Sequence, residues 1–259
     1  MMRIADARHV RVFILPLLLI ATWQALANLL PNPRTPTPFN VLRAIEQLTA
    51  SGDLPLGVLQ SVGRVFGGFA VAALLAVPLG IVMGSVRAVE RNLDPVIESF
   101  RPIAAIAILP LVILWLGTGT SAAIAIVAYA AFFPIIINTV AGVKRVDANM
   151  INAARVMGVS RFDVMRTVLV PAALPSIGTG LRIGMGVAWT AIIAAELAVG
   201  AKAGGGGSGG IGQMMFVFYA YSIELNRIVA CMIAVGCVAI ALDQLLRLLL
   251  ARAMPWIPR

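Results

Sequence analysis

The feature that most constrains this chain is its series of long apolar stretches. A bilayer core about 30 Å thick is crossed by roughly 20 apolar residues in a helix. Six stretches are candidates for such spans: Val12–Leu30, Val65–Val86, Ile103–Leu116, Ser121–Val143, Ile177–Gly200 and Ile228–Leu250. The third is short for a full span and is flanked by proline. The pattern predicts an all-α membrane protein with about six transmembrane helices, because helices satisfy their own backbone groups in hydrocarbon.

The composition agrees with a membrane protein. Sixty per cent of the 259 residues are hydrophobic and 12% are charged, against about 45–50% and about 25% in typical soluble domains. Disorder is excluded by the apolar content, and two cysteines are too few for a disulfide framework. Both cysteines, Cys231 and Cys237, fall in the sixth span, where packing is the expected role. We expect one transmembrane domain over residues 12–250, between short cytoplasmic tails at 1–11 and 251–259.

The basic residues indicate an orientation. With the N-terminus inside, 14 of the 20 Lys and Arg residues fall in inner segments, including Arg87, Arg91 and Arg101, and five fall in outer segments, including Arg64. Short cytoplasmic loops carry the Lys/Arg excess, so both termini are expected in the cytoplasm. Omitting the third span would place the most basic loop outside. The basic N-terminus and Ala25-Leu26-Ala27 also fit a cleaved signal peptide, although the apolar stretch is long for one.

Two outer segments have a distinctive composition. After the proline-rich residues 31–38, a short amphipathic helix is expected over Asn40–Ala50, capped by Asn40. The run AGGGGSGGIG at 203–212 is typical of a flexible, tolerant loop.

The loop over residues 144–176 carries the strongest local signals. Asp147 is placed to cap a helix through residues 148–157, and Gly158 suits the left-handed position that ends it. Ser160 and Asp163 form a capping pair for a second helix. We expect Pro171 and Pro175 to stop that second helix.

This helix–turn–helix pattern is open to three interpretations. It could bind DNA, it could dock into a groove of a cytoplasmic partner, or it could lie on anionic lipid at the inner membrane surface. A recognition helix tethered a few residues before the span at Ile177 could hardly lie along a duplex. The position therefore favours docking over nucleic-acid binding, and the elaborate capping exceeds what lipid binding needs.

The same loop resembles the EAA loop of ATP-binding cassette (ABC) importer permeases. That motif reads E-A-A, three residues, G, nine residues, I, one residue, L-P; here it reads Asn152-Ala153-Ala154, Gly158, Val168 and Val170-Pro171 at the same spacing. The glutamate is replaced by asparagine, which removes a charge that could contact the ATPase. The resemblance implies that the ATPase-coupling residues are Asn152, Ala153, Ala154, Gly158, Ser160, Arg161, Val168 and Pro171.

The resemblance extends over roughly residues 35–250. Segments that carry it include Ser61–Val65, Arg101-Pro102, Leu109-Pro110-Leu111, Trp115–Gly119, Phe132–Ile135, Gly180–Ile183 and Ala194–Leu197. The pattern is most similar to the nitrate, sulfonate, taurine and bicarbonate branch. It implies a type I importer permease fold with a coupling helix between spans four and five.

The implied assembly has several other parts. It would contain a second permease subunit, most simply in a homodimer, two cytoplasmic ATP-binding subunits and an extracytoplasmic substrate-binding protein. The complex would lie in the lipid of the inner membrane of a bacterium. The chain carries no G-x-x-x-x-G-K-[S/T] phosphate-binding motif. We therefore expect no enzyme activity and no cofactor on this chain, with ATP and Mg on the partner ATPase.

Charge inside the membrane marks function by default. Arg182 can reach the inner interface, and Asp243 can pair with Arg247 one turn on. Glu196 has no such local partner, which leaves a buried structural pair and a gate or pathway role open. Polar or aromatic candidates for the pathway are Trp189, Thr190, Asn138, Thr139, Trp115 and Thr118, with helix packing as the alternative for each. A secondary carrier without an ATPase is the alternative function.

Overall fold

The computed structural model describes residues 14, 18–29, 35–200 and 209–255. The predicted N-terminal tail, residues 203–208 of the glycine-rich run and residues 256–259 of the C-terminal tail lie outside these ranges. Within them the chain is helical and contains no strand. After an apolar helix at Leu18–Leu29, the α-helices are α2 (Pro38–Ala50), α3 (Asp53–Ser85), α4 (Arg87–Phe100), α5 (Leu109–Leu116), α6 (Thr120–Lys144), α7 (Ala148–Val156), α8 (Arg161–Val164), α9 (Val170–Gly200), α10 (Ile211–Val217) and α11 (Leu225–Ala253).

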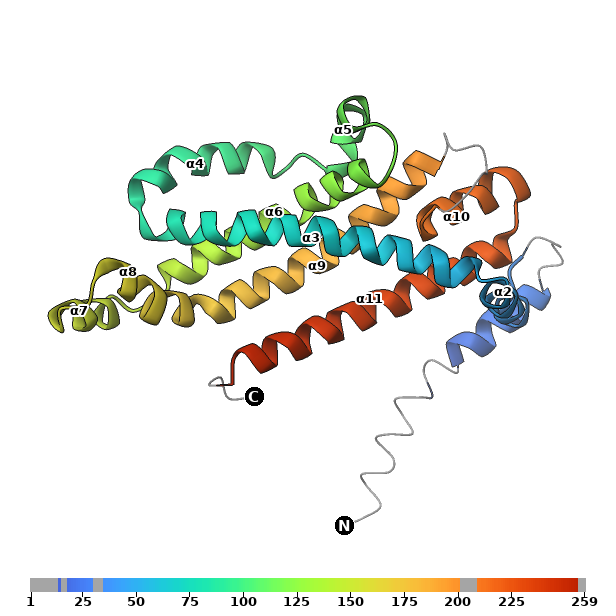
Figure 1. Cartoon of the computed structure of the whole chain (residues 1–259). Helices are drawn as coiled ribbons and strands as arrows, with labels where there is room; N and C mark the ends of the chain where they lie inside the picture. Colours follow the sequence, from blue (N-terminus) through green and yellow to red (C-terminus); the bar gives the residue numbers. More distant parts are fainter. Residues whose placement is uncertain (1–13, 15–17, 30–34, 201–208, 256–259) are drawn as a thin grey trace, which may run out of the picture.

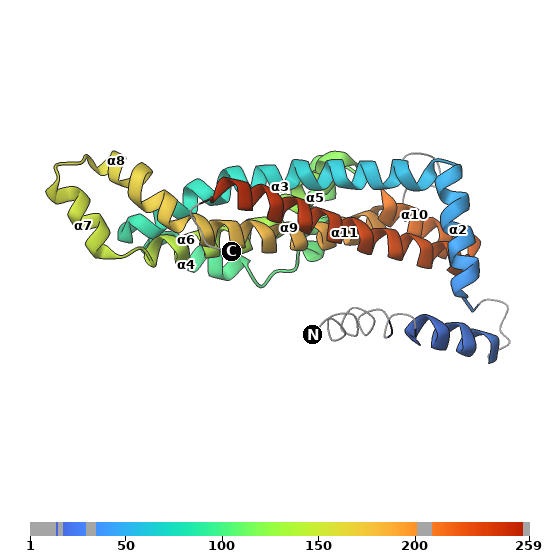
Figure 2. The ribbon, with the colours of Figure 1, turned by 90° about the horizontal axis from the view of Figure 1, so that it is seen from below.

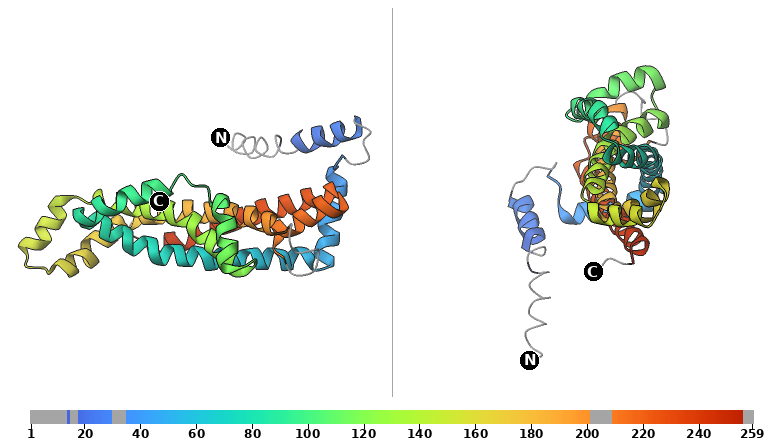
Figure 3. Two further views of the ribbon diagram at one scale, coloured as in Figure 1. Left: turned by 90° about the horizontal axis from the view of Figure 1, so that it is seen from above. Right: turned by 90° about the vertical axis from the view of Figure 1, so that its left-hand side faces the viewer.

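The long helices form an elongated bundle. Figure 1 shows α3, α6 and α9 running side by side, with α11 along one side of them. The α7 and α8 helices project from one end of the bundle, and α2 and α10 lie at the opposite end (Figures 1 and 2). We refer to these as the α7–α8 end and the α2–α10 end. The Leu18–Leu29 helix lies apart from the bundle in Figures 2 and 3.

The contact between α3 and α6 depends on small residues. Gly68, Ala72, Ala76, Gly80 and Gly84 recur every four residues along one face of α3, the spacing that lets membrane helices approach closely. A Cβ atom added at Gly68 would lie 2.6 Å from the Cβ of Val127, and one added at Gly84 would lie 2.6 Å from the Cβ of Val143. The hydrogen-only side chain of glycine is therefore what allows α6 this close to α3.

Four described helical segments are long and apolar enough to cross a membrane, and a fifth candidate is a bent pair. The four are Asp53–Ser85, Thr120–Lys144, Arg161–Ala198 and Leu225–Ala253. The pair consists of Arg87–Phe100 and Ala105–Leu116, which meet at 84°. Within the predicted first span the described helix, Leu18–Leu29, is shorter than a full span. The all-α membrane fold is confirmed, and the number six stays a prediction.

In two segments that are expected on the outer side from the sequence, the helices differ from those predicted. Helix α3 begins at Asp53, twelve positions before the predicted start of the span at about Val65, so Arg64 lies within a helix. Helix α2 is capped by Thr37, whose hydroxyl accepts from the backbone N–H of Asn40 at 3.2 Å. Pro38 occupies the first helical turn, where a missing N–H costs nothing.

The prediction that Pro171 and Pro175 stop the helix after Ser160 is also wrong. The segment Arg161–Ala198 is one continuous helix, with a π turn at Met165–Leu169 that ends two residues before Pro171. A π turn shifts the hydrogen-bond register by one residue, which accommodates a residue that lacks an N–H. Pro175 is likewise inside α9.

The close packing of α3 predicts a contrast between two glycines of the same helix. Gly68→Ala should destabilise the protein by about 1–3 kcal/mol, the usual cost of overpacking, because the new methyl group would overlap Val127. Gly63→Ala should not, because a Cβ atom there meets nothing within 4 Å. Heating the purified protein in detergent and measuring the fraction that stays monodisperse compares the two. Equal midpoints for Gly68→Ala and the unmodified protein would contradict this account of the packing.

Candidate functional site

The α7–α8 end is built from local capping interactions. The Asp147 carboxylate accepts from the backbone N–H of Asn149 at 2.9 Å, which confirms the predicted cap. Gly158 has φ +77°, and its N–H donates to the carbonyl of Arg155 while the N–H of Val159 donates to that of Ala154. This pair of bonds is the Schellman arrangement that ends a helix at a left-handed glycine.

The second helix starts as predicted. The Ser160 hydroxyl accepts from the backbone N–H of Asp163 at 3.2 Å and lies 2.5 Å from the Asp163 carboxylate. Of the eight residues expected to couple to an ATPase, Asn152, Ala153, Gly158, Ser160 and Arg161 are exposed, Ala154 is buried, and Val168 and Pro171 are half-buried. Together the two helices make a projecting tip.

The surface of this tip is more apolar than the sequence pattern suggested. Val156, Met157 and Phe162 have exposed fractions of 88%, 75% and 64%. Three large apolar side chains exposed around one turn, among basic residues, are typical of a surface that another protein covers. The coupling motif did not include them, although their position beside Gly158 makes them part of the same tip.

The predicted pathway residues separate into two groups. Asn138 and Thr190 line one cavity of about 680 Å³ on the side of α6 and α9. Trp189 is 3% exposed and its indole N–H donates to the carbonyl of Val235 at 3.2 Å, so it packs α9 against α11. Thr139 is buried and its hydroxyl donates to the carbonyl of Ile135 in the same helix, and Trp115 is 73% exposed on α5. The structure therefore brings Asn138 and Thr190 together and leaves the two tryptophans elsewhere.

The cavity also contains residues that sequence reasoning missed. Arg101 and Tyr129 line it, and Tyr129 donates through its hydroxyl to the carbonyl of Phe100 at 2.8 Å, with the carbonyl of Ile103 at 3.3 Å. These contacts fix the break between α4 and the Ala105–Ile108 turn against α6. Arg101 counts among the inner basic residues in the sequence-based prediction, because residues 87–102 are too polar to resemble a span.

Glu196 lies in a buried polar cluster between α3, α9 and α10. Its carboxylate is 2.8 Å from the Arg64 guanidinium and accepts from the Ser61 hydroxyl and the Gly212 N–H. Ser61 in turn accepts from the N–H of Ile211 at 2.9 Å. The Glu196 residue is 4% exposed. The absence of a local partner was therefore misleading, and these contacts match the buried structural alternative.

A second ion pair corrects two expectations. Arg182 of α9 binds Asp243 of α11 through two nitrogens, at 2.8 and 3.0 Å from Oδ1. Arg182 is thus bonded to a neighbouring helix where a reach toward the interface was expected, and the partner of Asp243 is Arg182 and not Arg247. Each side chain is about two-fifths exposed, so this pair is more hydrated than that of Arg64 and Glu196.

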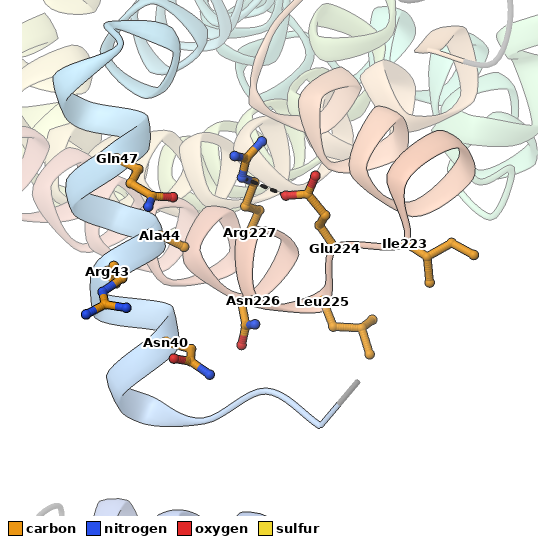
Figure 4. Close-up of a pocket in the computed structure, with 9 residues that line it drawn as sticks. All are labelled: Asn40, Arg43, Ala44, Gln47, Ile223, Glu224, Leu225, Asn226 and Arg227. Carbon is orange, nitrogen blue, oxygen red and sulfur yellow. Dashed lines mark ion pairs between the residues drawn. The ribbon is translucent and has the colours of Figure 1, made fainter. Parts of the chain in front are cut away.

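A polar recess lies at the α2–α10 end. Its volume is about 360 Å³, and Figure 4 shows Asn40 and Gln47 of α2 pointing toward the turn at 223–227, with Arg43 also in the lining. Glu224 and Arg227 form an ion pair of 2.7 Å across that turn. Among the described residues, no cluster of His, Cys, Asp and Glu could hold a metal ion.

The two ion pairs predict unequal costs of losing an arginine. Arg64→Leu leaves the nearly inaccessible Glu196 without its cationic partner, which should cost about 3 kcal/mol or more. Arg182→Leu leaves a more hydrated Asp243 and should cost about 1 kcal/mol. Unfolding of the two purified variants in a denaturing detergent series gives the order. A larger loss for Arg182→Leu would contradict the assignment of Arg64 and Glu196 as the dominant pair.

Comparison with known proteins matches this architecture to one family. Residues 76–255 match the family described as the binding-protein-dependent transport system inner membrane component. A Methanocaldococcus jannaschii protein named as an ABC transporter permease is 38% identical, over 93% of this chain and 90% of its own. The taurine transport system permease TauC of Escherichia coli is 36% identical and the nitrate import permease NrtB of Synechocystis 33%, each over 92% of this chain and 86% of its own.

Solved structures show the same fold. An inward-facing MetNI methionine ABC transporter aligns with a TM-score of 0.58 at 23% identity, covering 75% of this chain and 94% of its own. An amino acid ABC transporter crystallised with histidines aligns with a TM-score of 0.59 at 16% identity, covering 81% and 98%. The family match and the curated relatives exclude the secondary carrier and the DNA-binding protein. In ABC importers of this kind ATP hydrolysis lies with separate subunits. The chain belongs to the inner-membrane permease components of ABC importers that work with a substrate-binding protein.

Proposed function

We propose that this chain forms half of a pathway for a small oxyanion or an oxyanion-bearing solute of the nitrate, sulfonate, taurine or bicarbonate class. The observation that carries the proposal is the similarity of nearly the whole chain to permeases named for aliphatic sulfonates, taurine and nitrate. These solutes share a compact anionic group with several oxygen acceptors, which a guanidinium can bind in pairs.

The α7–α8 end faces the cytoplasm in this proposal. Five basic residues gather there: Lys144, Arg145, Arg155, Arg161 and Arg166. The bias of Lys and Arg toward cytoplasmic loops supports this orientation, with both termini inside, the tails 1–11 and 251–259 outside the membrane domain, and six spans in a bacterial inner membrane. The α2–α10 end, with its polar recess, then faces the extracytoplasmic substrate-binding protein.

Each chain supplies one wall of the pathway, and a second copy supplies the other. In a single chain α5 exposes large apolar side chains, with Leu114 at 77% and Trp115 at 73%. These side chains need either lipid or another subunit to cover them. The partner ATP-binding subunits hold ATP and Mg, and this chain binds no cofactor.

The α7–Gly158–α8 tip transmits the work of the ATPase. Val156, Met157 and Phe162 insert into a groove on the ATP-binding subunit, beside Asn152, Ser160 and Arg161. Because Arg161–Ala198 is one continuous helix, a displacement of the tip is carried into the membrane as a rigid movement. Closure of two ATP-binding subunits would thus draw two tips together and alter access to the pathway.

Uptake by the assembled transporter tests the function. We expect the tagged chain, isolated from its own host, to retain ATP-binding subunits. In proteoliposomes with its binding protein it should import labelled nitrate, taurine, methanesulfonate or bicarbonate only when ATP is present on the cytoplasmic side. Import of a neutral or cationic solute, with none of these four, would contradict the proposed class.

The turn at Gly158 predicts which substitutions break coupling. A β-branched residue is strongly disfavoured at φ +77°, whereas asparagine tolerates the left-handed region. Gly158→Val should lower ATP-driven uptake about tenfold, since a strained turn costing about 1–2 kcal/mol misplaces the tip. Gly158→Asn should retain uptake within about twofold.

Side-chain size alone is not the reason, because a Cβ atom at Gly158 meets nothing within 4 Å. ATP hydrolysis stimulated by the binding protein, measured beside uptake, separates lost coupling from lost assembly. Equal uptake in the Val and Asn variants would show that the turn conformation does not matter.

A further inference from the structure

Arg101 places a positive charge near the middle of the bundle. The backbone on both sides of it is tied to Tyr129 through the carbonyls of Phe100 and Ile103. Tyr129 is the tenth residue of the 25-residue helix α6, and Figure 1 shows the α4–α5 connection beside the central part of the bundle. A charge at that depth of a membrane is costly, and such residues line pathways or pair with one another.

Arg101 is held less firmly by its acidic partner than Arg64 and Arg182 are by theirs. Arg64 is 15% exposed and Arg182 is held by three hydrogen bonds. Among the described residues, the Arg101 guanidinium makes one hydrogen bond, of 3.3 Å to Glu98 three residues earlier, and both side chains are more than half exposed. Most of the donors of this guanidinium are therefore available to another acceptor.

The 680 Å³ cavity surrounds those guanidinium donors with a mostly apolar lining, which favours an anion as their partner. Arg101 is the only charged side chain among the described residues that line it. The amide nitrogen of Asn138 is already bonded to the carbonyl of Pro134 and the hydroxyl of Thr190 to that of Val187. The remaining walls are mostly apolar, including Ile106 and Val187. In apolar surroundings a charge-assisted bond to an anion is stronger than in water.

A polar strip leads from the α7–α8 end toward this cavity. Glu90, Asp94, Glu98 and Arg101 recur at intervals of four, four and three residues, which places them on one face of α4. Glu90 pairs with Lys144 of α6. Asp94 and Glu98 line a second cavity of about 230 Å³ together with Lys144. The polar face of α4 thus extends from that end to Arg101.

We propose that Arg101 is the residue that contacts the anionic group of the solute midway through the pathway. This inference rests on the proposed function. The planar guanidinium donates two parallel N–H bonds to two oxygens of the nitrate, sulfonate or carboxylate group. Glu98 competes for the same donors, so that the Arg101–Glu98 ion pair forms again as the solute leaves. Binding in a pathway must be weak enough for release, and an internal competitor provides that.

The test uses the complete transporter with its binding protein in proteoliposomes, with labelled nitrate, taurine and methanesulfonate as probes. Arg101→Gln should lower uptake about tenfold or more, the loss expected for a charge-assisted hydrogen bond. Arg101→Lys, which keeps the charge without the fork, should fall between Arg101→Gln and the unmodified protein. The matched control is Arg91→Gln, a basic residue of the same helix that lines neither cavity. It should retain uptake within about twofold, as is usual for surface substitutions.

A second measurement distinguishes charge from structure. In a chain with Cys231 and Cys237 replaced by alanine, Arg101→Cys should regain uptake after reaction with a trimethylammonium-bearing methanethiosulfonate and not with a sulfonate-bearing one. Co-purified ATP-binding subunits and ATPase stimulation by the binding protein confirm assembly of each variant. Equal uptake by Arg101→Gln and the unmodified protein, or failure of both Arg101→Gln and Arg101→Lys to assemble, would overturn the proposal. An unmodified transporter that imports none of the probes would refute the proposed function and not the role of Arg101 alone.

Discussion

The close approach of α3, α6 and α9 is the constraint on which the rest of the structure depends. Without a hydrophobic driving force between helices in lipid, association relies on close packing, and small residues provide it. A Cβ atom added at Gly80 would lie 2.8 Å from the Cβ of Thr139, and one added at Gly180 would lie 2.8 Å from the Cβ of Asn138. Close packing of this kind fixes the relative positions of α3, α6 and α9. It places Asn138 in the lining of the cavity that Arg101 also lines, and it brings Ser61 and Arg64 to Glu196.

The helix packing decides which charged residues of the bundle pair with each other. The sequence alone could therefore not assign the partners of these ion pairs. Local periodicity identified only the neighbour four residues away, as for Asp243 and Arg247. The bonded pairs, Arg64 with Glu196 and Arg182 with Asp243, are separated by 132 and 61 residues in the chain. Only the relative placement of α3, α9 and α11 decides them. The apolar stretches did predict the helical class, because hydrophobicity and length are properties of single segments.

Capping could be predicted residue by residue because it is local. Asp147, Gly158 and Ser160 each act on backbone groups within a few residues, and the structure places all three as expected. The prediction that Pro171 ends the helix failed because the cost of a proline depends on the turn before it. Here that turn is a π turn, which needs no N–H from residue 171. Helix α4, at the end of which Arg101 lies, was not predicted for a related reason. Residues 87–100 have a charged face and an apolar face, so a test for uniform apolarity found no helix there.

The geometry also indicates where movement can occur. Arg161 at the tip and Thr190 at the cavity belong to one continuous helix, while Arg101 is tied to α6 through Tyr129. A change in cavity width within one chain would require α9 to slide past α6. Gly142, where an added Cβ atom would lie 2.5 Å from the Cβ of Ser176, leaves no slack for that. We therefore expect the two helices to move together, and in the proposed homodimer alternate access would then arise between this wall and the facing wall of the second subunit.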